Sequence, residues 1–202
     1  TEEEHIPNIS QGRISKQGKL CVESGQREWL HQLRQRCGHY CMTTLITGGN
    51  GFLANSLKQY IDGDYYGKDM LDITSRNCVR NLPTYDVLIH TATGNGNIKL
   101  NNNLPLLFSK AKKIFVFTSK QGTFMNWKKT GPINYGLEKL NLNFIVYRHN
   151  MEHHNVQIFE PGHMETVDQY NNIAKKISNL YIDWKFEKNM IYDISADRYL
   201  AY

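Results

Sequence analysis

Short apolar runs alternate with helical patterns along the chain from Met42 onward. The runs that predict buried strands are Leu45-Ile46, Tyr65-Tyr66, residues 87–89 and residues 114–117. Between them, apolar residues recur at helical spacing over residues 52–61, 74–82 and 103–111. A long helix over residues 133–152, a fifth strand over 156–159, a helix around 173–180 and a strand over 190–194 complete the pattern. This alternation predicts a Rossmann-like, doubly wound parallel sheet in three α/β/α layers.

Residues 1–41 differ in composition from the rest of the chain. They are polar, rich in Gln, Glu and Arg, and show no strand pattern, with one amphipathic stretch around Trp29. They also lack the apolar region of a secretory signal. We therefore expect an N-terminal extension of unknown role over residues 1–41 and one folded domain over residues 42–202.

Composition and charge exclude several classes of protein. The 202-residue chain is 40% hydrophobic and 21% charged, which is compatible with a single domain that has a substantial core. It contains no run of about 18 apolar residues, so no membrane span is expected. The net charge of +5 is small and dispersed, which does not indicate a nucleic-acid partner but allows an anionic ligand. Three of the four cysteines precede Met42, a distribution unlike a disulfide framework, and we expect a reducing, cytoplasmic location.

Two groups of side chains have metal-ligating chemistry but unfavourable spacing. Cys37, His39 and Cys41 occupy alternate positions, unlike a zinc knuckle, and no second ligand pair follows nearby. His149, His153 and the adjacent His154 could share part of a helix face, although the same pattern is common in a solvated turn. We predict no metal site.

A glycine-rich segment lies between the first predicted strand and the helix after it. Residues 47–54 read Thr-Gly-Gly-Asn-Gly-Phe-Leu-Ala. Gly48 permits a tight turn, Gly51 lets the main chain approach a pyrophosphate, and Ala54 is small enough for the helix to pack on the sheet. The start of that helix would offer unpaired N–H groups to phosphates. An ordinary tight turn could have this sequence, but its place between strand and helix favours nucleotide binding.

Tyr135 and Lys139 lie four residues apart in the predicted long helix and therefore share a face. Hydride delivery to a carbonyl carbon leaves an oxyanion that must be protonated. A phenol, with an ordinary pKa of about 10, becomes an effective acid/base when a neighbouring cation stabilises phenolate. Ser119 follows the run at 114–117, where a parallel sheet presents groups to its ligand. The alternative is a strand-end serine and an unrelated tyrosine and lysine.

Together these motifs resemble the short-chain dehydrogenases/reductases from Met42 nearly to the end of the chain. That family has the turn T-G-x-x-G-x-x-[GA], a catalytic serine, the pair Tyr-x-x-x-Lys and a P-G-x-x-x-T turn, to which residues 161–166 are similar. Residues 69–74 and 86–92 look like the dTDP-4-dehydrorhamnose reductase branch. The resemblance implies a Rossmann fold, hydride transfer with a nicotinamide cofactor, and pairing of helices between subunits in a homodimer or homotetramer.

The resemblance also implies roles for individual residues. Tyr135 would be the acid/base, Lys139 its activator and a ligand of the nicotinamide ribose, and Ser119 the hydrogen-bond donor to the substrate carbonyl. Asn103 is our choice for the family's helical asparagine, which Asn101 and Asn102 could also provide.

A larger set of residues is expected to bind the cofactor. Asp72 would bind the adenine amino group, Ala92 would lie beside the adenosine, and the turn that starts at Pro161 would lie beneath the nicotinamide. The complete expected set is Thr47, Gly48, Gly49, Asn50, Gly51, Phe52, Leu53, Lys68, Asp72, Ile73, Thr91, Ala92, Thr93, Tyr135, Lys139, Pro161, Gly162, Met164 and Thr166.

The end of the second predicted strand bears on the choice of cofactor. A carboxylate there would bind the ribose hydroxyls of NAD and repel the additional phosphate of NADP. The sequence at this point is Tyr66-Gly67-Lys68, and Lys68 could pair with a 2′-phosphate, so NADP is favoured and NAD is the alternative. If the strand ended one residue later, Asp69 would take this place and NAD would be favoured.

Two features depart from the family pattern. Residues 91–94 read Thr-Ala-Thr-Gly where Asn-Ala-Gly is usual, and the segment after Thr166 is too short for the substrate domain of the nucleotide-sugar branch. We predict an NADP(H)-dependent oxidoreductase that acts on a small carbonyl or alcohol. The alternatives are a non-catalytic nucleotide-binding sensor or scaffold, and a nucleotide-sugar reductase or epimerase.

Overall fold

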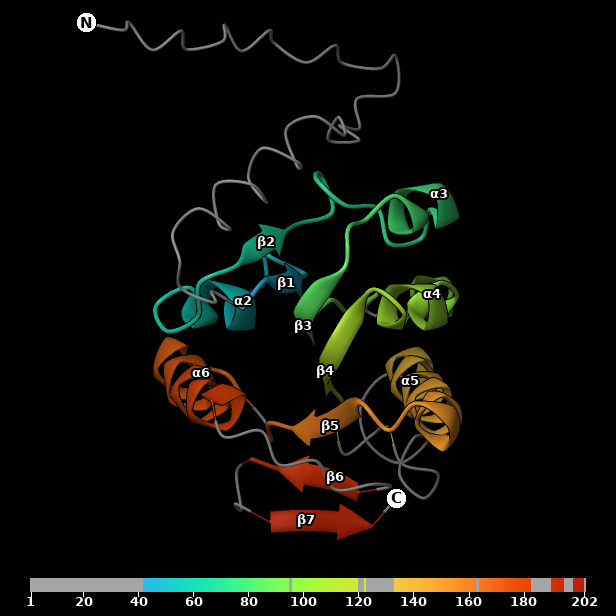
Figure 1. Ribbon diagram of the computed structural model, residues 1–202. Coiled ribbons are helices and arrows are strands. Elements are labelled where there is room, and N and C mark those ends of the chain that lie inside the picture. The colour runs from blue at the N-terminus through green and yellow to red at the C-terminus, as the bar shows by residue number, and fades with distance from the viewer. Residues whose placement is uncertain are drawn as a thin grey trace, which may run out of the picture.

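The computed structural model describes residues 42–94, 96–119, 122, 133–162, 164–182, 190–194 and 198–201. The expected N-terminal extension, with Cys37, His39 and Cys41, lies outside these residues. Within them the strands are β1 (Thr44–Thr47), β2 (Asp64–Tyr66), β3 (Tyr85–His90), β4 (Ala111–Phe117), β5 (Val156–Glu160), β6 (Met190–Asp193) and β7 (Arg198–Ala201). They form one sheet in the order β2-β1-β3-β4-β5-β6-β7 (Figure 1). Neighbouring strands are parallel except β7, which is antiparallel to β6.

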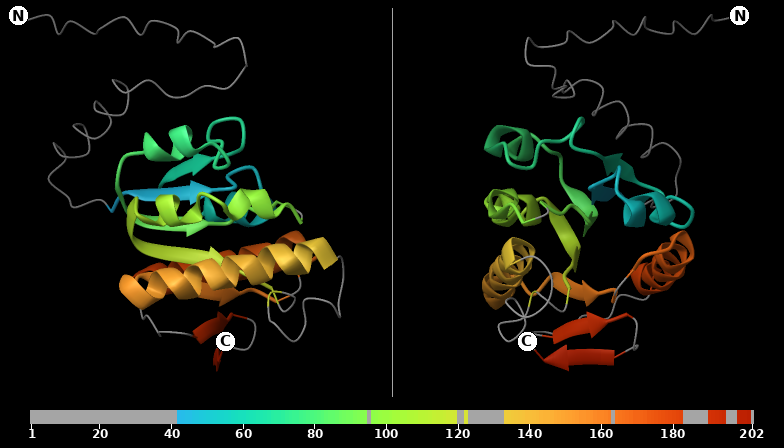
Figure 2. Two further views of the ribbon diagram at one scale, coloured as in Figure 1. Left: turned by 90° about the vertical axis from the view of Figure 1, so that its right-hand side faces the viewer. Right: turned by 180° about the vertical axis from the view of Figure 1, so that it is seen from behind.

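Helices cover both faces of this sheet, and the prediction of a doubly wound α/β/α fold is confirmed. Elements α3 (Arg76–Arg80), α4 (Leu104–Phe108) and α5 (Ile133–Glu152) lie on one face, with the short 3-10 helix η1 (Ile98–Asn101). Elements α2 (Phe52–Leu57) and α6 (Val167–Ile182) lie on the other face (Figure 2). Among these described helices, none is both long enough and apolar enough to cross a membrane.

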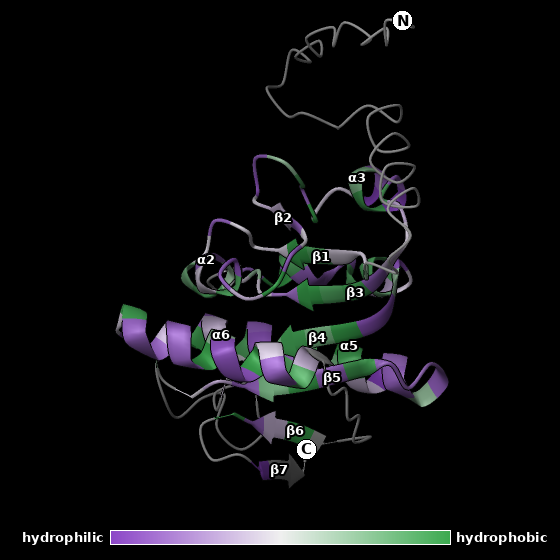
Figure 3. Cartoon of the chain, turned by 60° about the vertical axis from the view of Figure 1, so that its left-hand side comes forward, coloured by the Kyte–Doolittle hydropathy of each residue, from purple (hydrophilic) through white to green (hydrophobic). Residues whose placement is uncertain are grey.

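The alternation of side chains along the strands divides the core into two layers. Leu45, Leu88 and Ile158 belong to the layer beneath α3, α4 and α5, which also contains Val79, Leu107, Leu142 and Val146. Their neighbours in sequence, Ile46, Ile89 and Phe159, belong to the layer beneath α2 and α6. Because both faces of the central strands are buried, these strands are almost continuously hydrophobic (Figure 3).

Most predicted elements are present, but several boundaries differ. The long helix has the expected bounds, Ile133–Glu152. Three helices are shorter than expected: α3, for example, begins after Ser75, whose side chain accepts a hydrogen bond from the Cys78 amide, and it ends at Arg80. Strand β7 was not predicted, because four residues at the antiparallel edge of a sheet carry too little periodic signal.

The connections around β1 and β3 create the place where a ligand can bind. The chain leaves β1 towards α2 on one face, and it leaves β3 towards η1 and α4 on the opposite face. In an open parallel sheet such diverging connections leave a crevice at the carboxyl ends of the two strands.

Candidate active site

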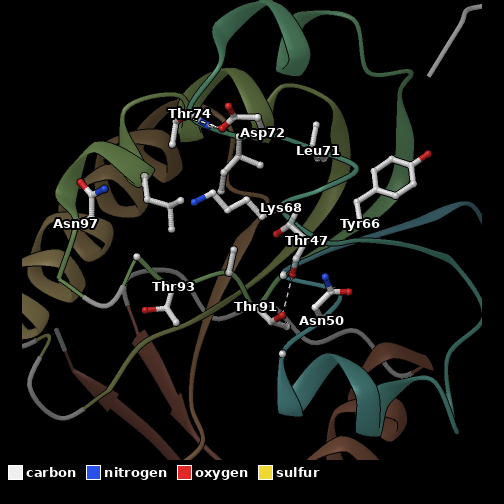
Figure 4. A pocket seen from close by; sticks show the side chains of 17 residues that line it. Thr47, Asn50, Tyr66, Lys68, Leu71, Asp72, Thr74, Thr91, Thr93 and Asn97 are labelled. Atoms are coloured by element: carbon white, nitrogen blue, oxygen red, sulfur yellow. Dashed lines mark hydrogen bonds between the residues drawn. The ribbon is translucent and has the colours of Figure 1, made fainter. Parts of the chain in front are cut away.

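A cavity of about 470 Å³ lies at the carboxyl ends of β1 and β3. Three segments build its wall: the glycine turn after β1, the segment after β2, and the loop after β3 (Figure 4). The lining residues are Thr47, Gly48, Asn50, Gly51, Tyr66, Gly67, Lys68, Leu71, Asp72, Ile73, Thr74, Thr91, Ala92, Thr93, Gly94, Asn97 and Leu100. The cavity therefore occupies the crevice that the strand order creates.

The glycine turn packs main chain against main chain on both sides. Gly48 has a φ of +76°, and a Cβ added there would lie 2.7 Å from the Ala92 nitrogen. A Cβ on Gly49 would lie 2.8 Å from the Tyr65 carbonyl carbon. Gly51 is less constrained: it has an extended conformation at the start of α2, and its Cβ would meet only the Gly48 oxygen, at 3.1 Å. Gly48 and Gly49 are thus the positions at which a side chain is excluded.

The segment after β2 presents one cation and one carboxylate to the cavity. Strand β2 ends at Tyr66, so Lys68 is the second residue after it, and its side chain extends into the cavity (Figure 4). Asp69 does not line the cavity, and its carboxylate instead accepts a hydrogen bond from Asn50 Nδ2 at 3.1 Å. The Asp72 carboxylate lies on the wall and accepts hydrogen bonds from the Thr74 amide and hydroxyl, at 3.1 and 2.6 Å.

The expected cofactor residues separate into those on the cavity wall and those elsewhere. On the wall are Thr47, Gly48, Asn50, Gly51, Lys68, Asp72, Ile73, Thr91, Ala92 and Thr93. Gly49 lies behind the turn against β2, and Leu53 is buried in the core beneath α2. Seven further lining residues were not expected from the sequence to bind the cofactor: Tyr66, Gly67, Leu71, Thr74, Gly94, Asn97 and Leu100. All except Leu100 fall within four residues of an expected cofactor position.

The part of the chain after β5 contacts the start of α2 through an aromatic pair. Phe52 stacks on Tyr170 of α6, with ring centroids 5.5 Å apart. Pro161 is buried, Gly162 has a φ of +78°, and Met164 packs against the α2 and α6 side of the core. The Thr166 hydroxyl accepts a hydrogen bond from the Gln169 amide at 3.3 Å. The start of α6 therefore packs beside the start of α2, and none of Pro161, Gly162, Met164 and Thr166 lines the described cavity.

Ser119, Tyr135 and Lys139 meet where β4 ends against α5. The Lys139 ammonium is buried, donates a hydrogen bond to the Phe117 carbonyl at 3.2 Å, and lies 5.6 Å from the centre of the Tyr135 ring. Ser119 Oγ is buried and forms no hydrogen bond of ordinary length within the described part of the chain. The structure thus brings together three of the four expected catalytic residues.

Burial is the largest influence on the pKa values of Tyr135 and Lys139. It raises the pKa of Tyr135; the nearby Ser119 hydroxyl opposes this rise, and the Glu138 carboxylate adds to it. Burial lowers the pKa of Lys139, and Glu138, 4.0 Å from its ammonium, opposes that change. In this environment the phenol holds its proton at neutral pH.

The fourth expected residue, Asn103, is engaged elsewhere. Its side-chain amide donates to the carbonyls of Ile73 and Thr74, at 3.0 and 2.8 Å, and so holds the segment after β2. Asn101 is the asparagine that reaches α5, where its amide donates to the Glu138 carbonyl at 2.9 Å. Asparagines one or two residues apart point in different directions on a helical turn. The sequence alone does not show which of them faces α5, so it did not distinguish Asn101 from Asn103.

His90 is a buried residue at this end of the sheet that the sequence analysis did not select. Its Nδ1 lies 2.7 Å from the Thr47 hydroxyl, and among the described residues nothing pairs with its buried Nε2. Burial, and then the charge of Lys139, lower the pKa of His90 to about 3, so the ring is neutral. The sequence signal that could have indicated its burial was its place directly after the apolar run Val87-Leu88-Ile89.

The described residues contain no group of three His, Cys, Asp or Glu side chains that could hold a metal ion. The rings of His149 and His153 lie 4.4 Å apart, but His149 Nε2 is 2.9 Å from the Asn155 side-chain oxygen.

Solved structures share this fold at low sequence identity. A carbonyl reductase from Pseudomonas aeruginosa PAO1, in complex with NADP, has a TM-score of 0.60 and 11% identity over 80% of this chain and 100% of its own. The enzyme WbmF from Bordetella bronchiseptica, in complex with NAD+, has a TM-score of 0.55 and 13% identity over 80% of this chain and 75% of its own. A GDP-L-fucose synthetase from Naegleria fowleri has a TM-score of 0.49 and 16% identity over 60% of this chain, which spans 50% of that protein. Neither a family model nor a curated protein sequence matches the chain. The first two likenesses support the Rossmann-like fold.

Proposed function

We propose that this chain is an oxidoreductase of the short-chain dehydrogenase/reductase type, which transfers a hydride between NADP(H) and a small carbonyl or alcohol. NAD(H) is the alternative cofactor. The observation that carries the proposal is the cavity at the carboxyl ends of β1 and β3, whose wall includes a turn in which Gly48 excludes any side chain. The hydroxyl of Thr93, on the same wall, donates a hydrogen bond to Glu138 of the helix that carries Tyr135 and Lys139.

The residues on the wall fit the adenosine half of such a cofactor. The cavity volume, about 470 Å³, is in the ordinary range for a cofactor site. Gly48 and Gly51 leave main chain exposed for a pyrophosphate, and the Lys68 ammonium suits a 2′-phosphate. Asp72, held by Thr74, offers carboxylate oxygens to the adenine amino group.

The three grouped side chains then have distinct tasks. When bound, the nicotinamide would supply or accept the hydride. Ser119 donates a hydrogen bond to the carbonyl oxygen, and Tyr135, which keeps its proton because its pKa is raised, gives that proton to the oxygen as charge develops. Lys139 stabilises the phenolate that remains. A protonated phenol is the form that the reduction of a carbonyl requires.

We also propose that the protein forms a homodimer or homotetramer through α5. Four large apolar side chains on this helix are exposed to solvent: Ile133, Phe144, Tyr147 and Met151. Their spacing places them along one side of the helix, where they form a stripe that we call the α5 stripe. A second copy of α5 would cover it.

Cofactor binding provides the direct test. At 100 times its dissociation constant, NADPH adds about 2.7 kcal/mol to the free energy of unfolding and raises the melting temperature. Gly48→Val and Asp72→Ala should remove this increase, and Gln59→Ala, at an exposed position two residues after α2, should retain it. If NADPH and NADH both leave the wild-type melting curve unchanged, the proposal is wrong. Binding without turnover of a panel of carbonyls, alcohols and nucleotide sugars would indicate a nucleotide sensor or scaffold instead.

A further inference from the structure

A buried carboxylate connects the cavity wall to the helix that carries the proposed catalytic pair. Glu138 directly precedes Lys139 on α5 and is 1% exposed. One of its oxygens accepts hydrogen bonds from the Thr93 hydroxyl and the Gly94 amide, each at 3.0 Å. The other accepts from the Gly96 amide at 2.6 Å. Hydrogen bonds to an ionised acceptor are strong, and loss of the acceptor would leave buried donors unpaired.

The loop that Glu138 holds forms part of the cavity wall. Thr93, Gly94 and Asn97 all line the cavity. Gly96 has a φ of +95°, and a Cβ there would lie 2.7 Å from Asn134 Cβ and 3.2 Å from the Tyr135 nitrogen. The loop therefore rests directly on the first turn of α5, beside the proposed acid/base.

A second anchor ties the far end of this loop to the same residue. The buried Asn101 donates from its amide to the Glu138 main-chain carbonyl at 2.9 Å, and also to Asn141 Oδ1 at 3.1 Å. Both ends of the segment 93–101 are thus attached to α5 at Glu138.

The charge of Glu138 also acts on the proposed catalytic pair. Its Oε1 lies 4.0 Å from the Lys139 ammonium, and both side chains are buried. Among the described residues, the other groups that face Lys139 carry no charge: Tyr135 on α5 is protonated, Ser119 at the end of β4 is neutral, and so is His90 on β3. Glu138 consequently favours the protonated forms of both Lys139 and Tyr135.

We propose that Glu138 is a positioning residue for the reaction of the proposed function, on which this inference rests. Its carboxylate holds the 93–101 wall of the cofactor cavity against α5 and, from the same position, sets the orientation and charge of Tyr135 and Lys139. Cofactor binding and proton transfer thereby depend on one buried side chain that touches neither the substrate nor the reacting atoms.

Glu138→Gln tests this role with little change in shape. The variant should bind NADPH about tenfold more weakly. The reason is that the glutamine side chain has an NH2 group in place of one carboxylate oxygen, and that group cannot accept the hydrogen bond from the Gly96 amide. Without the negative charge, the pKa values of Lys139 and Tyr135 should both fall, and the pH profile of kcat should move to lower pH. Ultraviolet difference spectra, with Tyr135→Phe as reference, should show phenolate at lower pH than in the wild type.

Two further variants separate positioning from simple stability. Glu138→Asp keeps the charge on a shorter side chain, so it should weaken NADPH binding but retain the wild-type pH profile. Glu152→Gln changes an exposed glutamate on the same helix and should change neither quantity. A lower melting temperature for Glu138→Gln, with NADPH affinity and phenol titration unchanged, would overturn the inference alone. Failure of the wild type to bind NADPH would overturn the proposed function as well.

Discussion

The ammonium of Lys139 lies over the face of the Tyr135 ring, 5.6 Å from its centre, while it donates a hydrogen bond to the carbonyl of Phe117 at 3.2 Å. The carbonyl at the end of β4 thus fixes the cation beside the phenol. A cation above an aromatic face is attracted to the ring, and more strongly when the ring becomes a phenolate. The consequence is that proton transfer from Tyr135 should depend on Lys139.

Removal of the phenol hydroxyl should abolish most of the activity. Tyr135→Phe keeps the ring in place, so NADPH should bind as in the wild type while carbonyl reduction falls by about 10² to 10⁴-fold. Lys139→Ala should cause a similar loss and also weaken NADPH binding. Tyr147→Phe, on the exposed side of the same helix, serves as the control. Steady-state kinetics with the wild-type rate in Tyr135→Phe would contradict the assignment.

Lys68 should determine the preference between the two nicotinamide cofactors. Its ammonium is exposed on the cavity wall, so Lys68→Ala should weaken NADPH binding by about fivefold and leave NADH binding unchanged. Lys58→Ala is a matched control: Lys58 is the C-cap residue of α2, and its ammonium donates a hydrogen bond to Asn55 Oδ1 at 2.9 Å. Titration calorimetry with both cofactors measures the ratio of the dissociation constants for NADPH and NADH. An equal loss for NADPH and NADH would show that Lys68 does not contact the 2′-phosphate.

The α5 stripe should mediate self-association. Replacement of Phe144 and Met151 by Glu places two charges among the exposed apolar side chains, and should convert an oligomer to a monomer without loss of folding. Lys175→Glu, at an exposed position on α6, should leave the assembly intact. Light scattering at micromolar concentration measures the oligomeric state, and a monomeric wild type would refute the proposed oligomer.

His90 should make the fold sensitive to acid. Its pKa is about 3 in the folded protein and about 6.5 in the unfolded chain, so the unfolded chain binds the proton first as pH falls. The stabilisation is therefore complete above about pH 6.5 and is lost towards pH 3, by about 1.4 kcal/mol per pH unit inside that window. His90→Asn should flatten this dependence in urea unfolding at pH 7 and pH 5. An equally steep dependence in the variant would assign it to other groups.

The sequence predicted strands β1 to β6 and the long helix because their signals are local. Val87-Leu88-Ile89 and the residues from Ile114 to Phe117 are continuous apolar runs, and Tyr135, Leu140, Phe144 and Ile145 recur at helical spacing within α5. The roles of Glu138 and His90 depend on partners that are distant in sequence: Glu138 accepts from Gly96, 42 residues away, and His90 contacts Thr47, 43 residues away. The sequence does not show such partners, because only the topology brings them together.

The described sheet ends on short strands, with three residues in β2 and four in β7. An unpaired strand edge is a template on which another chain can form hydrogen bonds, and a short edge offers few of them. Continuation of the sheet from one molecule into the next is therefore disfavoured at both margins, as is the slow conversion to fibres that such pairing can start. In the proposed oligomer, contact between copies would then fall to the helices, which would leave the carboxyl ends of β1 and β3 open to small molecules.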